Sequence, residues 1–230
     1  MRRTIVILIL TLITIVVSNA PIENACAHTY PQLPPAGIAI DPALRQTLVD
    51  RVRKIQTKID ETAKHSSDAA SWVPDVEVLV RAIRLALEQN LFYKESDAEF
   101  ASTLLDDATR RLSAVQRDVR GLALLGLADA VQDQPQLLVG GFRSSIDDSV
   151  QPYGLVIPAN YLDEGVATRV DVWLHGRGDT KTEVPFLRER MTKVGLYSPE
   201  KTIVLHPFGR HCNAFKFAGE TDVDEALAHL

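Results

Sequence analysis

Residues 169–178 read RVDVWLHGRG, and residues 201–209 read KTIVLHPFG. Each stretch is a short run of apolar and β-branched residues that ends in a histidine, at His175 and at His206. The segment between them, residues 182–194, has helical spacing and stops before a glycine. A strand, a helix and a strand in this order predict two parallel strands joined by a crossover. Because ligands bind outside the carboxyl ends of parallel strands, we expect the two histidine-containing loops to share one functional edge.

The first half of the chain has a helical pattern. Apolar residues recur at steps of three or four in three stretches, at residues 41–65, 74–91 and 100–115. The first stretch begins with Asp41-Pro42, which predicts an N-cap followed by a proline in the first turn. We therefore expect a small helical bundle over residues 41–130, preceded by an extended, proline-containing linker at residues 28–40.

The sequence changes character at residues 121–135, where glycine and proline interrupt the helical pattern, and we place a domain boundary there. The runs 137–146 and 151–158, joined by a turn at residues 147–149, predict a β-hairpin. A last helix is expected from Asp222. The predicted fold class is α/β: a helical N-terminal segment, then a β-hairpin and a β-α-β unit over residues 136–230.

The N-terminus has the pattern of a secretory signal. Arg2 and Arg3 precede an uncharged apolar run from Thr4 to Val17, and the small residues of Ala25-Cys26-Ala27 follow. The run is too short for the hydrocarbon core of about 30 Å, which favours a cleaved signal peptide at residues 1–27 over an anchor. We expect export to the periplasm or the extracellular space and no membrane contact after cleavage. An uncleaved N-terminal anchor is the alternative.

The charge and cysteine content of the chain exclude some classes of partner and of fold. The formal charge is −5, with 25 basic and 30 acidic residues, and this balance lacks the broad positive surface that nucleic acid requires. Nucleic acid is therefore not an expected partner. Two cysteines, Cys26 and Cys212, exclude a disulfide-stapled small fold, so the core must be hydrophobic.

Residues 150–161, 171–178 and 206–225 read VQPYGLVIPANY, DVWLHGRG and HPFGRHCNAFKFAGETDVDE. These three stretches resemble secreted bacterial prolyl-oligopeptidase-like serine hydrolases of peptidase family S9. The resemblance covers residues 136–230 well and the helical region loosely. It implies the first half of an α/β-hydrolase sheet, in which a loop after the third strand supplies half of the oxyanion hole. Peptides or esters are the implied substrates, and no cofactor is implied.

The chain departs from this family after its fourth expected strand. The family continues with a fifth strand and a G-x-S-x-G nucleophile elbow, then the Asp and His of the triad. No two of the twelve glycines stand four apart with serine between them. We therefore interpret the sequence as a hydrolase domain truncated before its nucleophile and inactive as given. The alternative is a secreted, non-catalytic binding module that uses the loop His175–Gly178.

The resemblance assigns the oxyanion hole to four consecutive residues, His175, Gly176, Arg177 and Gly178. A neighbouring pocket is expected to contain Trp173, His206, Phe208, Arg210 and His211. The two glycines suit this role because backbone N–H groups approach an anion most closely where no side chain intervenes. For Arg177 the simpler alternative is an ion pair with Asp179.

Metal and thiol chemistry are weaker interpretations. His175, His206 and His211 with Asp179 or Glu220 offer ligand types that zinc uses, but their spacing matches no zinc signature, so no metal site is expected. Cys212 beside His211 has no base in place, because neighbouring residues of an extended chain point apart.

A domain truncated in this way would leave one edge of its sheet uncovered. In the strand order of the resembled family, residues 169–174 would lie at an edge that the missing fifth strand should cover. Val170, Val172 and Leu174 protect such an edge poorly. Self-association through this edge is therefore a predicted partner interaction.

Overall fold

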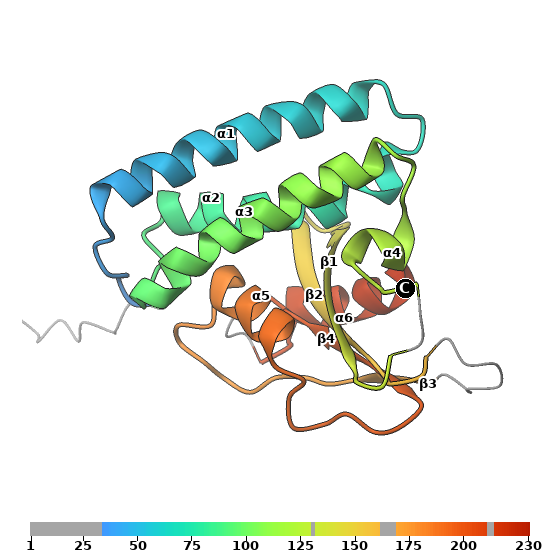
Figure 1. Cartoon of the computed structure of the whole chain (residues 1–230). Helices are drawn as coiled ribbons and strands as arrows, with labels where there is room; N and C mark the ends of the chain where they lie inside the picture. Colours follow the sequence, from blue (N-terminus) through green and yellow to red (C-terminus); the bar gives the residue numbers. More distant parts are fainter. Residues whose placement is uncertain (1–33, 130–131, 162–168, 211–213) are drawn as a thin grey trace, which may run out of the picture. The chain divides into compact units, whose positions relative to one another are not determined.

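The computed structural model describes residues 34–129, 132–161, 169–210 and 214–230. Its helices are α1 (Pro42–Lys64), η1 (Ala69–Ser71, a 3-10 turn), α2 (Val73–Glu88), α3 (Glu95–Val115), α4 (Gly121–Leu125), α5 (Glu183–Thr192) and α6 (Ala218–His229). Its strands are β1 (Gln136–Arg143), β2 (Val150–Ile157), β3 (Arg169–Val172) and β4 (Thr202–Pro207) (Figure 1). The predicted leader and residues 28–33 of the predicted linker lie outside the described residues. None of the described helices has the length and apolar character needed to span a membrane.

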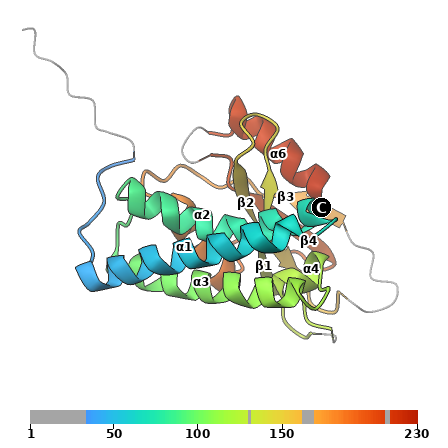
Figure 2. The same ribbon diagram turned by 90° about the horizontal axis from the view of Figure 1, so that it is seen from above.

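The three predicted helices are confirmed as α1, α2 and α3. The Asp41 carboxylate accepts a hydrogen bond of 2.8 Å from the Leu44 N–H, so the N-cap of α1 is as the sequence predicts. Helix α1 packs on α2 and α3 through its buried apolar residues, and Figure 2 shows the three helices side by side. The structure adds α4, a single turn that ends at Gly126 in the left-handed conformation, where the sequence predicts only a boundary.

The four strands form one mixed sheet in the order β1-β2-β4-β3. Strands β1 and β2 make the predicted hairpin, with Gln136 opposite Ile157 and Arg143 opposite Val150. Strand β2 pairs antiparallel with β4, and β4 pairs parallel with β3, which confirms the predicted parallel pair. All eight residues of β2 are buried, because it lies in the interior of the sheet and both its faces are covered.

Each face of the sheet has its own core. On one face Val139 and Val150 join the hydrophobic cluster of α1, α2 and α3, together with residues of α5. On the other face Leu155 and Leu205 pack with Ala226 of α6. The described residues between 34 and 230 belong to one compact unit. The predicted boundary at residues 121–135 therefore separates helices from strands along the chain, while both sides share one core.

Strand β3 is one edge of the sheet, in the position that the strand order led us to expect. Val170 and Val172 of the strand are 38% and 37% exposed, and Leu174, two residues after its end, is 49% exposed. The Trp173 N–H donates to the Leu205 carbonyl, so alternate residues such as Val172 turn their backbone groups away from β4. This edge offers hydrogen bonds and apolar area to a further strand.

One predicted boundary is wrong. The last helix begins at Ala218 and not at Asp222. Asp222 is an acidic residue of the kind that caps helices, but here its carboxylate accepts hydrogen bonds from Arg210 and is 1% exposed. Asp222 therefore lies inside the helix, where its carboxylate is held in a buried ion pair.

Gly141 sets how closely α2 approaches the sheet. A Cβ atom at this position would lie 2.4 Å from the Pro74 carbonyl oxygen and 2.8 Å from Val78 Cβ. We expect Gly141→Ala to lower the free energy of unfolding by about 1–3 kcal/mol, because backbone and core must move apart. Urea denaturation measures this change.

Gly176→Ala is the matched control, since nothing lies within 4 Å of an added Cβ there. We expect the control to stay within about 0.5 kcal/mol of the wild type. Equal stability of the two variants would show that α2 does not rest on β1 in this way.

Candidate functional site

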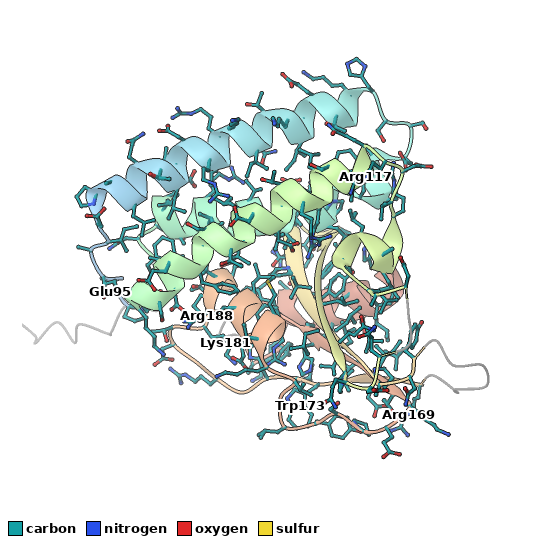
Figure 3. All side chains as sticks on the ribbon, viewed as in Figure 1. Glu95, Arg117, Arg169, Trp173, Lys181 and Arg188 are labelled. Carbon is teal, nitrogen blue, oxygen red and sulfur yellow. The ribbon has the colours of Figure 1, made fainter. Side chains whose placement is uncertain are left out.

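A cavity of about 240 Å³ lies beside the parallel pair and is enclosed by the loop that follows β3, by helix α5, by residues 195–196 and by His206 near the end of β4. We call it the strand-end pocket. It is lined by Trp173, Leu174, His175, Gly176, Lys181, Phe186, Glu189, Arg190, Gly195, Leu196 and His206 (Trp173 and Lys181 are labelled in Figure 3). The structure thus brings His175 and His206 to one edge, as the sequence predicts.

His206 is a buried, neutral base in this pocket. It is 3% exposed, and its Nδ1 lies 3.0 Å from a guanidinium nitrogen of Arg190. Burial and the neighbouring Arg190 charge lower its pKa from 6.5 to about 4. The same guanidinium nitrogen lies 3.3 Å from Nε2, so Arg190 can donate to whichever ring nitrogen carries the lone pair.

Helix α5 and Lys181, just before it, supply the charges of the pocket. Arg190 donates to Glu189 Oε1 at 2.6 Å, and Lys181 Nζ lies 2.9 Å from Glu189 Oε2. Burial alone would raise the pKa of Glu189, but the two ion pairs outweigh it and the pKa is lowered. The sequence prediction considered the strand ends and not the crossover segment, so it did not include these three residues. The signal available was the run of three charged residues at 188–190, directly after the apolar residues of the same helix.

His175 ties the two loops together. Its Nε2 lies 2.9 Å from the Phe208 carbonyl and its Nδ1 lies 2.8 Å from the Gly176 carbonyl. The ring also makes an edge contact with Phe215 at 5.0 Å between centroids. Both ring nitrogens face acceptors, so His175 is placed to position the loop rather than to take a proton from a ligand.

The predicted oxyanion residues do not all share the pocket. Gly176 lines it, and its backbone N–H has no hydrogen-bond acceptor among the residues that the structure describes. Arg177 pairs with Asp179 at 3.1 Å, the simpler alternative considered for it. Gly178 lies in the neighbouring cleft, where its carbonyl accepts from Lys181 N–H. The backbone N–H of His175, which also lines the pocket, likewise has no acceptor in the described part of the chain, but Gly176 has no side chain to hinder a ligand.

The predicted aromatic residues have different surroundings. Trp173 is 37% exposed, lines the pocket and stacks on Tyr197 at 5.3 Å between ring centroids. Phe208 is 3% exposed and packs on Phe186 behind His175, so it belongs to the core. Tyr197 in turn donates to Asp171 Oδ2. The Trp173 and Tyr197 pair therefore makes one wall of the pocket continuous with the edge strand.

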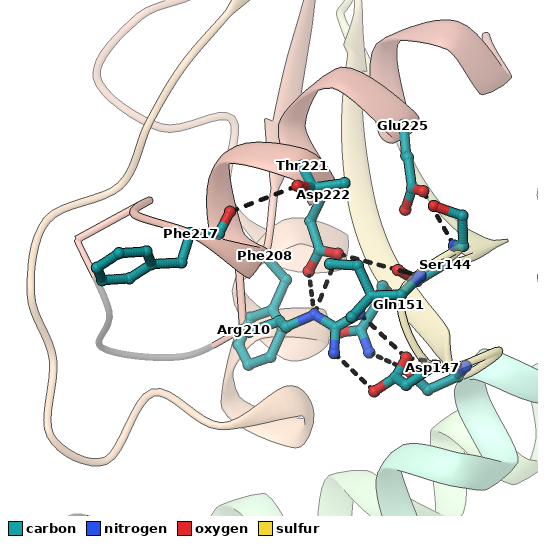
Figure 4. A network of polar contacts seen from close by, with 12 residues as sticks. Ser144, Asp147, Gln151, Phe208, Arg210, Phe217, Thr221, Asp222 and Glu225 are labelled. Carbon is teal, nitrogen blue, oxygen red and sulfur yellow. Dashed lines mark hydrogen bonds and ion pairs between the residues drawn. The ribbon is translucent and has the colours of Figure 1, made fainter.

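Arg210 lies apart from the pocket, in a polar network (Figure 4). Its Nε donates to both oxygens of Asp222, and its two terminal nitrogens donate to Asp147 at 2.7 and 3.1 Å. Asp147 belongs to the hairpin turn and Asp222 to α6. Arg210 thereby joins the turn, the loop after β4 and the last helix, a role that the sequence pattern does not reveal.

The remaining candidates concern metal and thiol chemistry. His211 and Cys212 lie outside the described residues. Among the residues that are described, no three His, Cys, Asp or Glu side chains are close enough to hold a metal ion. The described lining of the pocket contains no Ser, Thr or Cys nucleophile either. What the pocket can do is hold a carbonyl or an anion against Gly176, Lys181 and the buried Arg190.

Comparison of the chain with protein-family models, with curated proteins and with solved structures gave no match. The assignment of a function therefore depends on the chain's own residues and on the geometry described above.

The pKa of His206 makes stability depend on pH. Because this pKa is about 4 in the fold and 6.5 otherwise, the unfolded chain binds an additional proton between these values. The contribution of His206 is complete above pH 6.5 and is lost as the pH falls toward 4. Between pH 7 and pH 5 we expect the free energy of unfolding of the wild type to fall by about 2 kcal/mol more than that of His206→Gln, which lacks this titration.

Urea denaturation of both proteins across this range measures the difference, and an NMR titration of the His206 ring reads its pKa directly in the folded wild type. Parallel stability profiles with an unshifted NMR pKa would contradict the buried position.

The Arg210 network should contribute strongly to stability. Arg210→Ala leaves Asp222 buried without its partner, and we expect a loss of roughly 3 kcal/mol in the free energy of unfolding. Asp222→Asn added to Arg210→Ala should restore part of the loss, because the buried charge is then removed.

Arg53→Ala, which removes an exposed ion pair with Asp50, is the control, and its free energy of unfolding should stay within about 0.5 kcal/mol of the wild type. Thermal and urea unfolding of the four proteins test the network. A loss at Arg210 no greater than at Arg53 would argue against it.

Proposed function

We propose that residues 136–230 are the opening half of an α/β-hydrolase domain related to prolyl-oligopeptidase-like serine hydrolases. In this proposal the strand-end pocket holds the reacting carbonyl of a peptide or an ester. The observation that carries the proposal is the sheet order β1-β2-β4-β3 with an antiparallel hairpin and a parallel β3–β4 pair. This order brings the His-Gly loop after the third strand to the carboxyl end of the sheet, where the hydrolase fold has its oxyanion loop.

Gly176 is the proposed oxyanion donor. Its N–H has no acceptor within the described part of the chain, and an added Cβ would meet nothing within 4 Å, so a ligand atom has room beside it. His175 holds the loop through the Phe208 carbonyl, and Lys181 adds a positive charge. A backbone donor that is oriented in advance is the main requirement for stabilising a tetrahedral oxyanion.

The nucleophile, acid and base of a serine triad are not in the 230 residues in the pattern that the fold requires. The proposal places them in sequence beyond Leu230 in a longer product, or on a second chain that completes the sheet. The 230 residues alone are expected to have no serine-hydrolase activity.

A non-catalytic binding module is the second candidate. It is favoured by the same pocket, which combines an apolar wall at Trp173 with charges at Lys181 and Glu189 and has no nucleophile among its described residues. Such a lining of apolar surface and a few convergent polar groups is typical of ligand sites.

A fluorophosphonate probe, which modifies activated serines, tests the proposal. We expect no labelling of the purified 230-residue chain and labelling of the native secreted product, on a chain heavier than 25.4 kDa or on a co-purifying partner. Gly176→Pro, which removes the N–H, should slow labelling by about 10²–10³-fold in the native assembly. Gly176→Ala keeps the N–H and is the matched control.

The intact mass of the native product identifies which chain carries the label. The native product could have the mass of the short chain, carry no labelled partner and still bind ligand. That result would contradict the hydrolase proposal and favour the binding module.

A further inference from the structure

A second hollow, of about 430 Å³, adjoins the strand-end pocket between the start of α3 and the outer face of α5. We call it the cationic cleft. It is lined by Tyr93, Lys94, Ser96, Asp97, Gly178, Thr180, Lys181, Pro185, Arg188, Glu189, Thr192 and Lys193. Figure 3 shows Arg188 and Lys181 on the side of the molecule where α3 begins at Glu95. Four lining residues are basic and two are acidic, in a chain whose formal charge is −5.

The acidic residues of the cleft are already paired. Arg188 donates to Asp97 Oδ1 at 2.8 Å and to Ser96 Oγ at 2.7 Å, and Lys181 lies 2.9 Å from Glu189. Lys94 and Lys193 have no ion-pair partner among the described residues, and both are exposed. The excess positive charge of the cleft therefore sits on two lysines that come from different elements and face the same hollow.

A buried donor in the wall points to a ligand independently of the charges. The Tyr93 hydroxyl is buried and has no hydrogen-bond partner within the described part of the chain. Burial, followed by the charge of Glu183, raises its pKa, so the group remains a neutral O–H donor. A buried donor without an acceptor is costly, and a bound acceptor in the cleft would relieve that cost after a small shift of the ring.

The cleft and the strand-end pocket are neighbours. Lys181 and Glu189, which pair at 2.9 Å, line both, and the loop that contributes Gly176 to the pocket contributes Gly178 to the cleft. A ligand that follows this loop from one hollow would therefore reach the other.

We propose that the cationic cleft binds the carboxylate of an acidic peptide or ester whose carbonyl group lies in the strand-end pocket. This inference rests on the proposed function for the position of the carbonyl. Lys94 and Lys193 attract and hold the acidic group, the Ser96 and Thr180 hydroxyls are further donors, and the Tyr93 hydroxyl gains an acceptor. The site is then specific for acidic ligands. Helix α3 contributes to the binding surface through the cleft residues at its start.

A groove between α1 and α3 gives a control for general charge effects. Arg51, Lys54 and Lys58 line it, but Arg51 pairs with Asp106, and no residue of this groove lines the strand-end pocket. Neutralising Lys54 and Lys58 changes the net charge of the protein by the same amount as neutralising Lys94 and Lys193.

The test measures binding of two fluorescein-labelled tetrapeptides, Glu-Ala-Glu-Ala and Gln-Ala-Gln-Ala, to the full chain by fluorescence anisotropy. We expect the acidic peptide to bind more tightly, with a difference that shrinks as salt is added. Lys94→Gln with Lys193→Gln should weaken its binding about tenfold, and Lys54→Gln with Lys58→Gln less than about twofold. Melting temperatures of all variants check that the fold is retained.

Equal weakening by the two double variants would overturn the inference, because it would show a general charge effect. Equal affinity for the two peptides would overturn the acid specificity while leaving the proposed function in place, since the strand-end pocket would still bind both. Acid-selective binding that depends on Lys94 and Lys193 would support the cationic cleft as a binding site. If the native product then has no fluorophosphonate-reactive serine, the same result would reject the proposed hydrolase function.

Discussion

The close approach of α2 to β1 determines the arrangement of the rest of the molecule. Gly141 has no side chain, so the Pro74 carbonyl and Val78 lie directly against the strand, and the Gly141 N–H donates to the buried Asp75 carboxylate at 3.0 Å. Burial raises the pKa of Asp75, and this hydrogen bond opposes the shift. Arg111, itself 1% exposed, donates to the Asp75 carbonyl from α3. One contact therefore fixes two helices against the hairpin, and a larger residue at position 141 would open the core of the whole unit.

A second glycine, which also allows a close approach to the sheet, positions the candidate site. Gly154 in β2 leaves room for the stem of Arg190, whose Cγ would lie 2.7 Å from an added Cβ. Helix α5 can therefore lie close to the sheet and bring Arg190 within hydrogen-bond distance of His206 at the end of β4. Without that room Arg190 could not reach His206, and the charges of Glu189 and Lys181 would not converge on the strand-end pocket. The geometry of the pocket thus depends on a glycine in a strand that contributes no lining residue.

The elements that the sequence predicts best are those whose signal is local. The N-cap at Asp41, the apolar stripes of the first three helices and the turn-joined hairpin depend on residues a few positions apart. The pocket residues His175, Gly176 and His206 also follow from local pattern, because strand ends meet at one edge. Arg190, Arg210 and Asp222 were not predicted in their observed roles because each depends on a partner in another element. A charged residue in a helix or loop gives no local sign that it will be buried against a histidine or a distant carboxylate.

The exposed edge and the strand-end pocket are parts of one surface. Trp173 follows β3 directly, lines the pocket and stacks on Tyr197, which donates to Asp171 of the strand. A strand that paired with β3 would use the outward backbone groups of Val170 and Val172 and would cover Leu174, which is 49% exposed at the mouth of the pocket. Because Gly176 follows two residues after Leu174, the end of such a strand would lie beside the proposed oxyanion donor. Completion of the sheet and completion of the site would then occur in the same step. Under the proposed function, this geometry is the physical reason to look for the nucleophile on whatever chain covers β3.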